Sequence, residues 1–250
     1  MAARFAPLGL RIASVLLLLG IWHLAAWQWH NSMLPSPAMV LQVILRETLS
    51  GELLYHLAAT LLRVLIAFVI AMLVGSVIGI VMGRSRRIDQ LFDPWLIFFL
   101  NLPALVVIIL CYIWFGLEEA SAIFAIVINK VPNVVVTLRE GARTLDPSYL
   151  EMARSFDLSR RKTLLRITLP QLLPYFTVAA RSGLSLIWKI VLVVELLGRS
   201  SGIGFQLHLF FQMFDVAGIL AYSLSFILVM LVIEYAFLQP LERRANRWRR

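Results

Sequence analysis

The chain has 250 residues, of which 60% are hydrophobic and only 15% are charged. Soluble domains carry about 25% charged residues, so this composition excludes an ordinary soluble protein and indicates a membrane protein. The formal net charge of +9 comes from arginines and lysines that cluster in short loops between apolar segments, which argues against nucleic-acid binding. The single cysteine, Cys111, excludes an internal disulfide.

Six apolar segments are long enough to cross a hydrocarbon core of about 30 Å, which takes roughly 20 helical residues. They cover residues 10–27, 61–82, 94–115, 120–138, 172–197 and 217–238. We therefore predict an all-α integral membrane protein with six transmembrane helices. The alternative for the first segment is a cleaved signal peptide, because Arg11 precedes a Leu-rich stretch. The bulky Trp22, His23 and Trp27 surround the would-be cleavage site and disfavour this alternative.

The basic residues predict the orientation of the chain. Two precede the first apolar segment, three follow the second, seven follow the fourth and five follow the sixth, which places 17 of the 23 on one side. They are Arg4, Arg11, Arg84, Arg86, Arg87, Arg139, Arg143, Arg154, Arg160, Arg161, Lys162, Arg166, Arg243, Arg244, Arg247, Arg249 and Arg250. The opposite loops hold only Arg46 and Arg199. Because Lys and Arg concentrate in cytoplasmic loops, we expect both termini in the cytoplasm.

The first half of the chain carries three local signals. Residues 38–49 follow a Pro-containing turn and form an amphipathic segment, which predicts a surface helix on the outer face. Three glycines at four-residue intervals in the second segment indicate a stripe where another helix packs closely; they are Gly75, Gly79 and Gly83. Asn101 and Pro103 interrupt the third segment and predict a kinked or broken helix.

Polar residues inside the later segments indicate the interior of the bundle. Asn129 and Lys130 lie well inside the fourth segment, where lipid-facing helices avoid polarity. Arg181, Lys189 and Glu195 lie in the fifth segment. One reading has Lys130, Arg181 and Lys189 giving a cavity positive potential suited to small anions. The other has Lys130 or Lys189 paired with Glu195 or Glu234. We take Asn129, Lys130, Arg181, Ser185, Lys189 and Glu195 as candidate residues of a translocation pathway.

Residues 198–215 join three glycines to an aromatic amphipathic stretch, which predicts a turn followed by a short helix at the outer interface. A phosphate loop at residues 202–204 is disfavoured, because no strand precedes it and no lysine follows it. The isolated histidines His23, His30, His56 and His208 are expected to be amphipathic surface residues rather than metal ligands.

The basic amphipathic segment 151–170 follows the fourth apolar segment and carries a recognisable spacing. Glu151, Ala153, Ile167, Leu169 and Pro170 match the signature Glu-Ala-Ala, three residues, Gly, nine residues, Ile, one residue, Leu-Pro. This signature is that of bacterial ABC importer permeases, which the chain resembles. Met152 replaces the second Ala and Asp157 replaces the Gly. We predict two short helices, at 147–156 and 159–167, with a turn at 157–158 where Asp157 or Ser159 caps the second helix.

Three further stretches extend the resemblance to the nitrate, sulfonate and taurine branch of type I ABC importer permeases. They are Thr60-Leu61-Leu62-Arg63, Trp114-Phe115-Gly116 and Val194-Glu195-Leu196-Leu197-Gly198 ahead of Ser201-Gly202-Ile203-Gly204. The resemblance implies a single permease domain over residues 1–250, with a core bundle at about 57–240 and a coupling loop at about 139–170. It implies a homodimer in the inner membrane, two ATPase subunits on the cytoplasmic side and a substrate-binding protein outside.

The same resemblance assigns roles in the loop. Glu151 would make a polar contact in a groove of the ATPase, Ala153 would permit close approach, and Leu150 and Phe156 would contribute apolar surface. Asp157, Ile167, Leu169 and Pro170 complete the coupling set. The alternative is a basic loop held near anionic lipid, which explains its arginines but leaves the signature unused.

No P-loop and no hydrolase or metalloprotease motif occurs in the sequence. We therefore expect no cofactor on this chain, with ATP and magnesium used by the partner ATPase. The expected substrate is a small anion such as a sulfonate, taurine, nitrate or bicarbonate. Remaining alternatives are an uncharged or cationic metabolite, an ATP-independent channel, and an intramembrane enzyme, for which Ser182 and Ser185 lack a nearby base.

Overall fold

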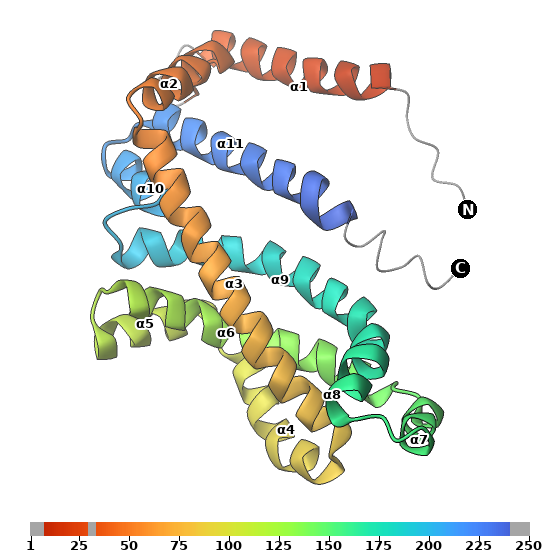
Figure 1. Ribbon diagram of the computed structural model, residues 1–250. Helices are drawn as coiled ribbons and strands as arrows, with labels where there is room; N and C mark the ends of the chain where they lie inside the picture. The colour runs from red at the N-terminus through yellow and green to blue at the C-terminus, as the bar shows by residue number, and fades with distance from the viewer. Residues whose placement is uncertain (1–7, 30–33, 241–250) are drawn as a thin grey trace.

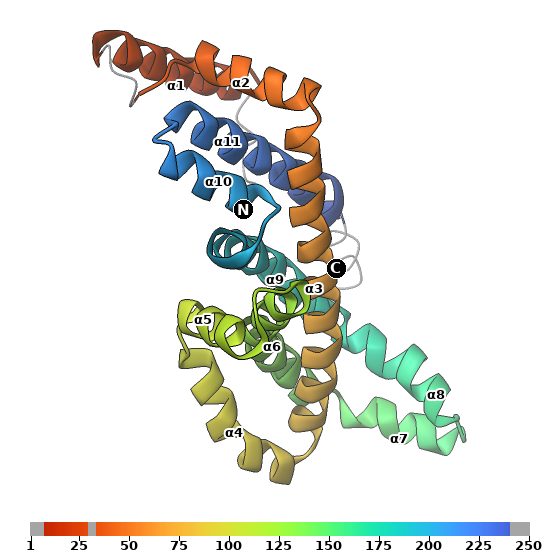
Figure 2. The same cartoon turned by 90° about the vertical axis from the view of Figure 1, so that its left-hand side faces the viewer.

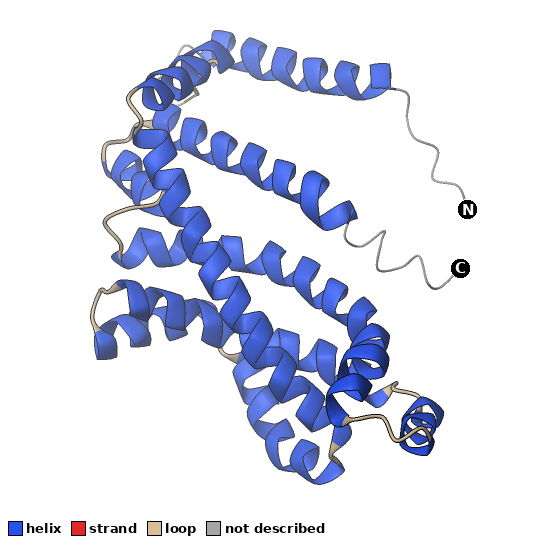
Figure 3. Cartoon of the chain, viewed as in Figure 1, coloured by secondary structure: helices blue, strands red, loops and turns tan. Residues whose placement is uncertain are grey.

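The computed structural model describes residues 8–29 and 34–240, and all regular elements in these ranges are helical (Figures 1 and 3). In chain order they are α1 (Leu8–Trp29), α2 (Pro37–Leu49), α3 (Glu52–Arg84), α4 (Arg86–Asn101), α5 (Ala104–Phe115), α6 (Glu119–Arg143), α7 (Pro147–Ser155), α8 (Arg160–Thr163), the π-helical turn η1 (Leu164–Thr168), α9 (Leu169–Gly198), α10 (Ile203–Gln212), α11 (Val216–Ile233) and the π-helical turn η2 (Glu234–Leu238). Arg4, His30 and the arginines at 243–250 lie outside the described residues.

Helix α3 packs along α6 through the glycine stripe, which confirms the close helix contact predicted from the sequence. A methyl group added at Gly75, Gly79 or Gly83 would lie within 2.7 Å of an atom of α6. Side-chain-free positions thus let the two backbones approach closely. Figure 2 shows α3 running the length of the molecule beside α6 and α9. The α3–α6 pair therefore forms the frame on which the other helices pack.

The predicted interruption of the third apolar segment is a sharp break between α4 and α5. The two helices meet at an angle of 95°. Leu102 adopts an extended conformation, with φ −69° and ψ 126°, because a residue that precedes proline is disfavoured in the helical region. The Asn101 side chain donates to the carbonyl of Ile97 at 2.7 Å and so satisfies one of the last carbonyls of α4.

The predicted outer amphipathic helix and the short helix after the glycine turn are both present, as α2 and α10. Ser36 caps α2 by accepting from the Met39 amide at 3.3 Å. Helix α1 packs on this region, where Trp22 Nε1 donates to the carbonyl of Pro35 at 3.1 Å. In Figure 1, α1 and α2 lie above α11, and α10 lies beside the start of α3.

Four stretches in the described residues are long and apolar enough to span a membrane, or five if the bent α4–α5 pair counts as one span. They are α3, α6, residues 161–198 and residues 216–236. The apolar stretch of α1, Ala13–Gln28, is too short to count as a membrane span by the same measure. The all-helical architecture is therefore that of a multi-pass membrane protein.

Candidate functional site

The connection between α6 and α9, residues 144–168, projects from one corner of the molecule (Figures 1 and 2). We call it the connecting loop. Its first helix, α7, has Asp146 as N-cap, which accepts from the Ser148 amide at 2.9 Å, and Pro147 in the first turn. The Asp146 amide donates to Gln171 Oε1 of α9 at 3.2 Å. The start of the loop is thus tied to the first turn of α9.

The end of α7 shows why Asp157 occupies a position where glycine is usual. Asp157 has a positive φ of 50°. The Leu158 amide donates to the Ala153 carbonyl at 2.9 Å, and the Asp157 amide donates to the Arg154 carbonyl at 3.0 Å. This pair of bonds is the Schellman motif, which requires a left-handed residue at the position of Asp157. Asp157 therefore ends the first helix, and the prediction that it caps the second helix is wrong.

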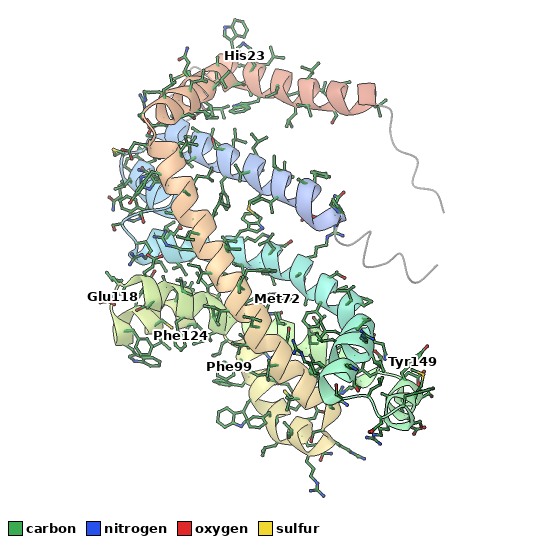
Figure 4. The ribbon with its side chains drawn as sticks, viewed as in Figure 1. His23, Met72, Phe99, Glu118, Phe124 and Tyr149 are labelled. Atoms are coloured by element: carbon green, nitrogen blue, oxygen red, sulfur yellow. The ribbon has the colours of Figure 1, made fainter. Side chains whose placement is uncertain are left out.

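The outward face of α7 is partly apolar. Phe156 is 74% exposed, Tyr149 is 51% exposed and Glu151 is also exposed. Ala153 is only 2% exposed, so its small side chain permits close packing within this chain and does not lie on the outward face. Leu150 belongs to the same helix. In Figure 4, Tyr149 on this helix and Glu118 before α6 lie at opposite ends of the molecule.

The second half of the loop is continuous with α9. Helix α8 passes through η1 directly into α9, and Pro170 lies in the first turn of α9. The prediction of a separate second helix that ends at residue 167 is therefore wrong. A proline ring clashes with the carbonyl four residues earlier in an ideal α-helix, and the π turn lies where that clash would occur. Ile167 is buried, while Leu169 and Pro170 are exposed.

Helix α9 exposes a polar row inside its apolar length. Arg181, Ser185 and Lys189 recur at every fourth position, so they share one face of the helix, and all three are exposed. Arg181 forms an ion pair with Glu234 across 3.3 Å. The Lys189 amine lies 5.6 Å from the ring centroid of Trp188.

Lys130 and Asn129 lie apart from this row. Lys130 is 1% exposed, and its amine has no hydrogen-bond partner among the residues that the structure describes. Its side chain packs on Gly183, where an added Cβ would lie 2.9 Å from Lys130 Cε. The Asn129 amide donates to the carbonyl of Ala125 in its own helix at 2.8 Å. The predicted pairing of Lys130 or Lys189 with Glu195 or Glu234 does not occur within the described ranges.

Glu195 instead lies in a buried network whose cation is Arg63. Glu195 is fully buried and Arg63 is 4% exposed. Arg63 Nη1 donates to Glu195 Oε1 at 2.6 Å and to the Ser201 carbonyl at 2.8 Å. Glu195 Oε2 accepts from Thr60 Oγ1 and from the Gly204 amide, both at 2.9 Å. The carboxylate therefore joins α3, α9 and the start of α10.

Two further groups extend this network toward the surface. Arg63 and Arg199 both pair with Glu119 at the start of α6, and the Arg199 to Glu119 distance is 2.7 Å. His56 accepts from the Gly202 amide through Nδ1 at 3.0 Å and is 4% exposed. The prediction that His56 is a surface residue is therefore wrong. Thr60 and Arg63 belong to a stretch of family resemblance, and an arginine inside an apolar helix was the signal that could have predicted the network.

Comparisons with known proteins agree with this architecture. A chain in the structure of inward-facing conformations of the MetNI methionine ABC transporter superposes with a TM-score of 0.69 at 12% identity, over 80% of this chain and 99% of that one. This likeness shows the fold. The aliphatic sulfonates transport permease protein SsuC of Escherichia coli (strain K12) is 36% identical over 203 residues, which cover 78% of this chain and 76% of that protein.

The taurine transport system permease protein TauC of the same strain is 29% identical over 248 residues, which cover 96% of this chain and 89% of that protein. Residues 71–244 match the family described as "Binding-protein-dependent transport system inner membrane component". That match takes in α6, the connecting loop and α9. The chain belongs to this family and is an inner-membrane permease subunit of an ABC importer.

Proposed function

We propose that the permease spans the membrane six times with both termini in the cytoplasm, and that the connecting loop is its cytoplasmic coupling element. Arginines at the ends of α3 and α6 and at the start of α4 gather at the end of the molecule that carries the connecting loop, whereas Glu118 lies at the other end (Figure 4). Positive loops remain in the cytoplasm. In this arrangement α1 and the bent α4–α5 pair are the remaining two spans of a single domain, residues 1–250.

The coupling step would be carried by the outward face of α7. Tyr149 and Phe156, seven residues apart, offer apolar contacts on one side of the helix, and Glu151 offers a polar contact on the other side. The side chain of Leu150, which is predicted for the same contact, lies outside the part of the chain that the structure describes. We assign ATP and magnesium to the partner ATPase, so no nucleotide or other cofactor would bind to this chain.

The connecting loop would pass movement to the bundle through continuous helix. Residues 161–198 form one helical stretch of 38 residues, and the loop is also attached to α9 at Gln171. The contact on α7 is joined to this helix by the short turn at residues 156–159 and by the hydrogen bond between Asp146 and Gln171, so nucleotide-driven closure would reach the polar row of α9 through these two connections. In this scheme the shape of the loop is fixed by four residues: Asp157, Ile167, Leu169 and Pro170.

A pull-down tests the coupling assignment. The detergent-solubilised permease is captured from its native membrane, and the ATPase that co-purifies is measured for the wild type and for Glu151→Lys. Glu118→Lys is the matched control, because it makes the same charge change at an exposed position on the opposite end. We expect loss of the ATPase in Glu151→Lys alone. Equal recovery in all three proteins would contradict the proposal.

The exposed polar row of α9 supports a dimer with a shared pathway. In an isolated subunit the exposed Lys189 would face lipid, at a cost of roughly 2.5 to 3.5 kcal/mol for a cation near the bilayer centre, whereas Arg181 is paired with Glu234 and Ser185 lines a pocket against α11. A second copy that places the same row opposite would enclose these groups in an aqueous passage. We therefore propose a homodimer whose pathway is lined by this row. Lys130 and Asn129 would lie behind the row, near Gly183, and Glu195 would fix the outer end of α9.

The substrate class we propose is a small anion. The supporting observations are the exposed Lys189 on α9, beside an Arg181 that is paired with Glu234, and relatives whose names refer to aliphatic sulfonates and taurine. A sulfonate, taurine, nitrate or bicarbonate would be delivered by an extracytoplasmic binding protein.

Uptake into proteoliposomes that contain the complete transporter provides the test. Lys189→Gln should lower uptake of the anion while ATPase co-purification is kept, and Lys162→Gln should change neither. Unchanged anion uptake in Lys189→Gln, or uptake restricted to an uncharged metabolite, would refute the anion assignment.

A further inference from the structure

A basic groove lies where the end of α3, the start of α4 and the end of α6 meet. Its volume is about 440 Å³, and it is lined by Met82, Gly83, Arg84, Arg86, Asp89, Gln90 and Arg143. Three of these seven side chains are cationic and one is anionic. The groove is separate from the outward face of α7 and from the polar row of α9, so neither the coupling step nor the pathway uses it.

The charges in the groove leave a net attraction for anions. Asp89 is already engaged, because its two oxygens accept from Arg143 Nη2 and, at 3.3 Å, from Arg139 Nη1. Arg84 and Arg86 are exposed and form no ion pair with another described residue. The first turn of α4 adds the positive end of a helix dipole beside them. An anion in the groove would therefore meet two arginines whose charge is not compensated by a neighbouring carboxylate.

The position of the groove along α4 indicates what kind of anion it meets. Leu91, Phe92 and Trp95 follow Arg86 on the same helix and are 66%, 49% and 62% exposed. At helical rise they lie roughly 8 to 14 Å further along the axis. Exposed apolar and aromatic side chains of a membrane protein lie in the hydrocarbon or at its border. The arginines then lie at the level of the lipid head groups.

We propose that this groove binds the phosphate of an anionic phospholipid head group through Arg84 and Arg86, because Arg143 is already paired with Asp89 and Glu140. Basic pockets between transmembrane helices on the cytoplasmic side are suited to such head groups. Arginine recognises phosphate through paired N–H donors. The occupant would brace the α3–α4 turn against the end of α6, next to the connecting loop. This assignment rests on the proposed function, which places the groove on the cytoplasmic side of the membrane.

Native mass spectrometry of the full-length permease, titrated with phosphatidylglycerol or phosphatidylcholine, tests the site. The variant is Arg84→Gln/Arg86→Gln, and Arg161→Gln/Lys162→Gln in the connecting loop is the control with the same change in charge. We expect the wild type to prefer phosphatidylglycerol and the groove variant to bind it roughly 30-fold more weakly. The control should bind as the wild type does. Wild-type affinity in the groove variant, or equal loss in the control, would overturn the proposal.

A second measurement distinguishes a bound lipid from a bound soluble phosphate. Excess inorganic phosphate should leave the bound phosphatidylglycerol in place, and its displacement would reject the lipid assignment. Size-exclusion profiles of all variants exclude misfolding as the cause. Because the assay contains no ATPase, its failure is distinct from failure of the coupling assignment. If the coupling pull-down fails while lipid binds in the groove, the coupling role of α7 needs revision and the lipid site stands on its own result.

Discussion

Arg63 Nη1 donates to Glu195 Oε1 across 2.6 Å, although 132 positions separate the two residues in the chain. Both side chains are almost completely excluded from solvent. The pair connects α3 to the end of α9 and brings along the Ser201 carbonyl and the Gly204 amide. The C-terminal end of α9 is therefore fixed to α3 by an ion pair, while its N-terminal end continues from the connecting loop.

Loss of one partner of this pair should destabilise the permease strongly. Arg63→Met leaves the Glu195 carboxylate buried without its cation, and breaking a buried pair in this way costs about 3 to 5 kcal/mol. Cys111 is buried and is the only cysteine, so a thiol-reactive dye reports unfolding on heating. We expect Arg63→Met to label at a clearly lower temperature than the wild type.

The double variant Arg63→Met/Glu195→Leu provides the control for this prediction. Replacing both charges with apolar groups removes the uncompensated carboxylate, so the double variant should label at a higher temperature than Arg63→Met alone. Additive destabilisation in the double variant would show that Arg63 and Glu195 do not stabilise the structure as a pair.

Gly202 should tolerate no side chain. Its φ is +111°, and an added Cβ would overlap the Glu195 carboxylate. Gly116 has a φ of +79° but open space around it, so Gly116→Ala carries the backbone strain alone, about 1 to 2 kcal/mol. We expect Gly202→Ala to lower the dye-labelling temperature well beyond Gly116→Ala. Equal shifts in the two variants would mean that the overlap with Glu195 is relieved at no cost.

Asp157→Gly should stabilise the turn after α7. The left-handed conformation of Asp157 costs a residue with a side chain about 1 kcal/mol or more, and glycine avoids this cost. We expect slower proteolysis of the connecting loop in Asp157→Gly and faster proteolysis in Asp157→Val, whose branched side chain disfavours a positive φ. Ser155→Gly, inside α7, is the control and should speed cleavage. Faster cleavage of Asp157→Gly than of the wild type would contradict the assigned turn.

The α3–α6 seam should be sensitive to one added methyl group. In Gly79→Ala the Cβ would lie 2.7 Å from the Val135 carbonyl oxygen and 3.0 Å from Leu138 Cβ. Overpacking of this kind costs roughly 1 to 3 kcal/mol. Gly20→Ala in α1 meets no atom within 4 Å and should be neutral or stabilising. The dye-labelling temperatures of the two variants are compared. An unchanged labelling temperature in Gly79→Ala would show that α3 and α6 can move apart without loss of stability.

Local sequence signals predicted the elements well. The break at Pro103, the helix after Ser36 and the glycine stripe each depend on neighbouring residues or a simple period, so their physical cause is visible in the sequence. The helix that continues through Pro170 was missed, because a proline normally marks a boundary and the π turn that accommodates it has no residue signature.

Local sequence signals could not predict the partners of the buried charges. Glu195 was expected to pair with Lys130 or Lys189, and the structure gives it Arg63 from a helix far away in the chain. Periodicity assigns a residue to a face but carries no information on which distant face it meets. His56 was assigned to the surface for the same reason, since nothing near it in sequence reveals the Gly202 amide that it accepts from.

Cross-linking from α7 tests the central claim most directly. A Cys111→Ser background removes the only native thiol, and Phe156→Cys or Leu117→Cys then places one thiol at an exposed position, on α7 or on the opposite end. A thiol-to-amine cross-linker is added to native membranes that contain the transporter. We predict an adduct between Phe156→Cys and the ATPase subunit, and none from Leu117→Cys. An ATPase adduct from Leu117→Cys, or its absence from Phe156→Cys while the ATPase co-purifies, would contradict coupling through α7.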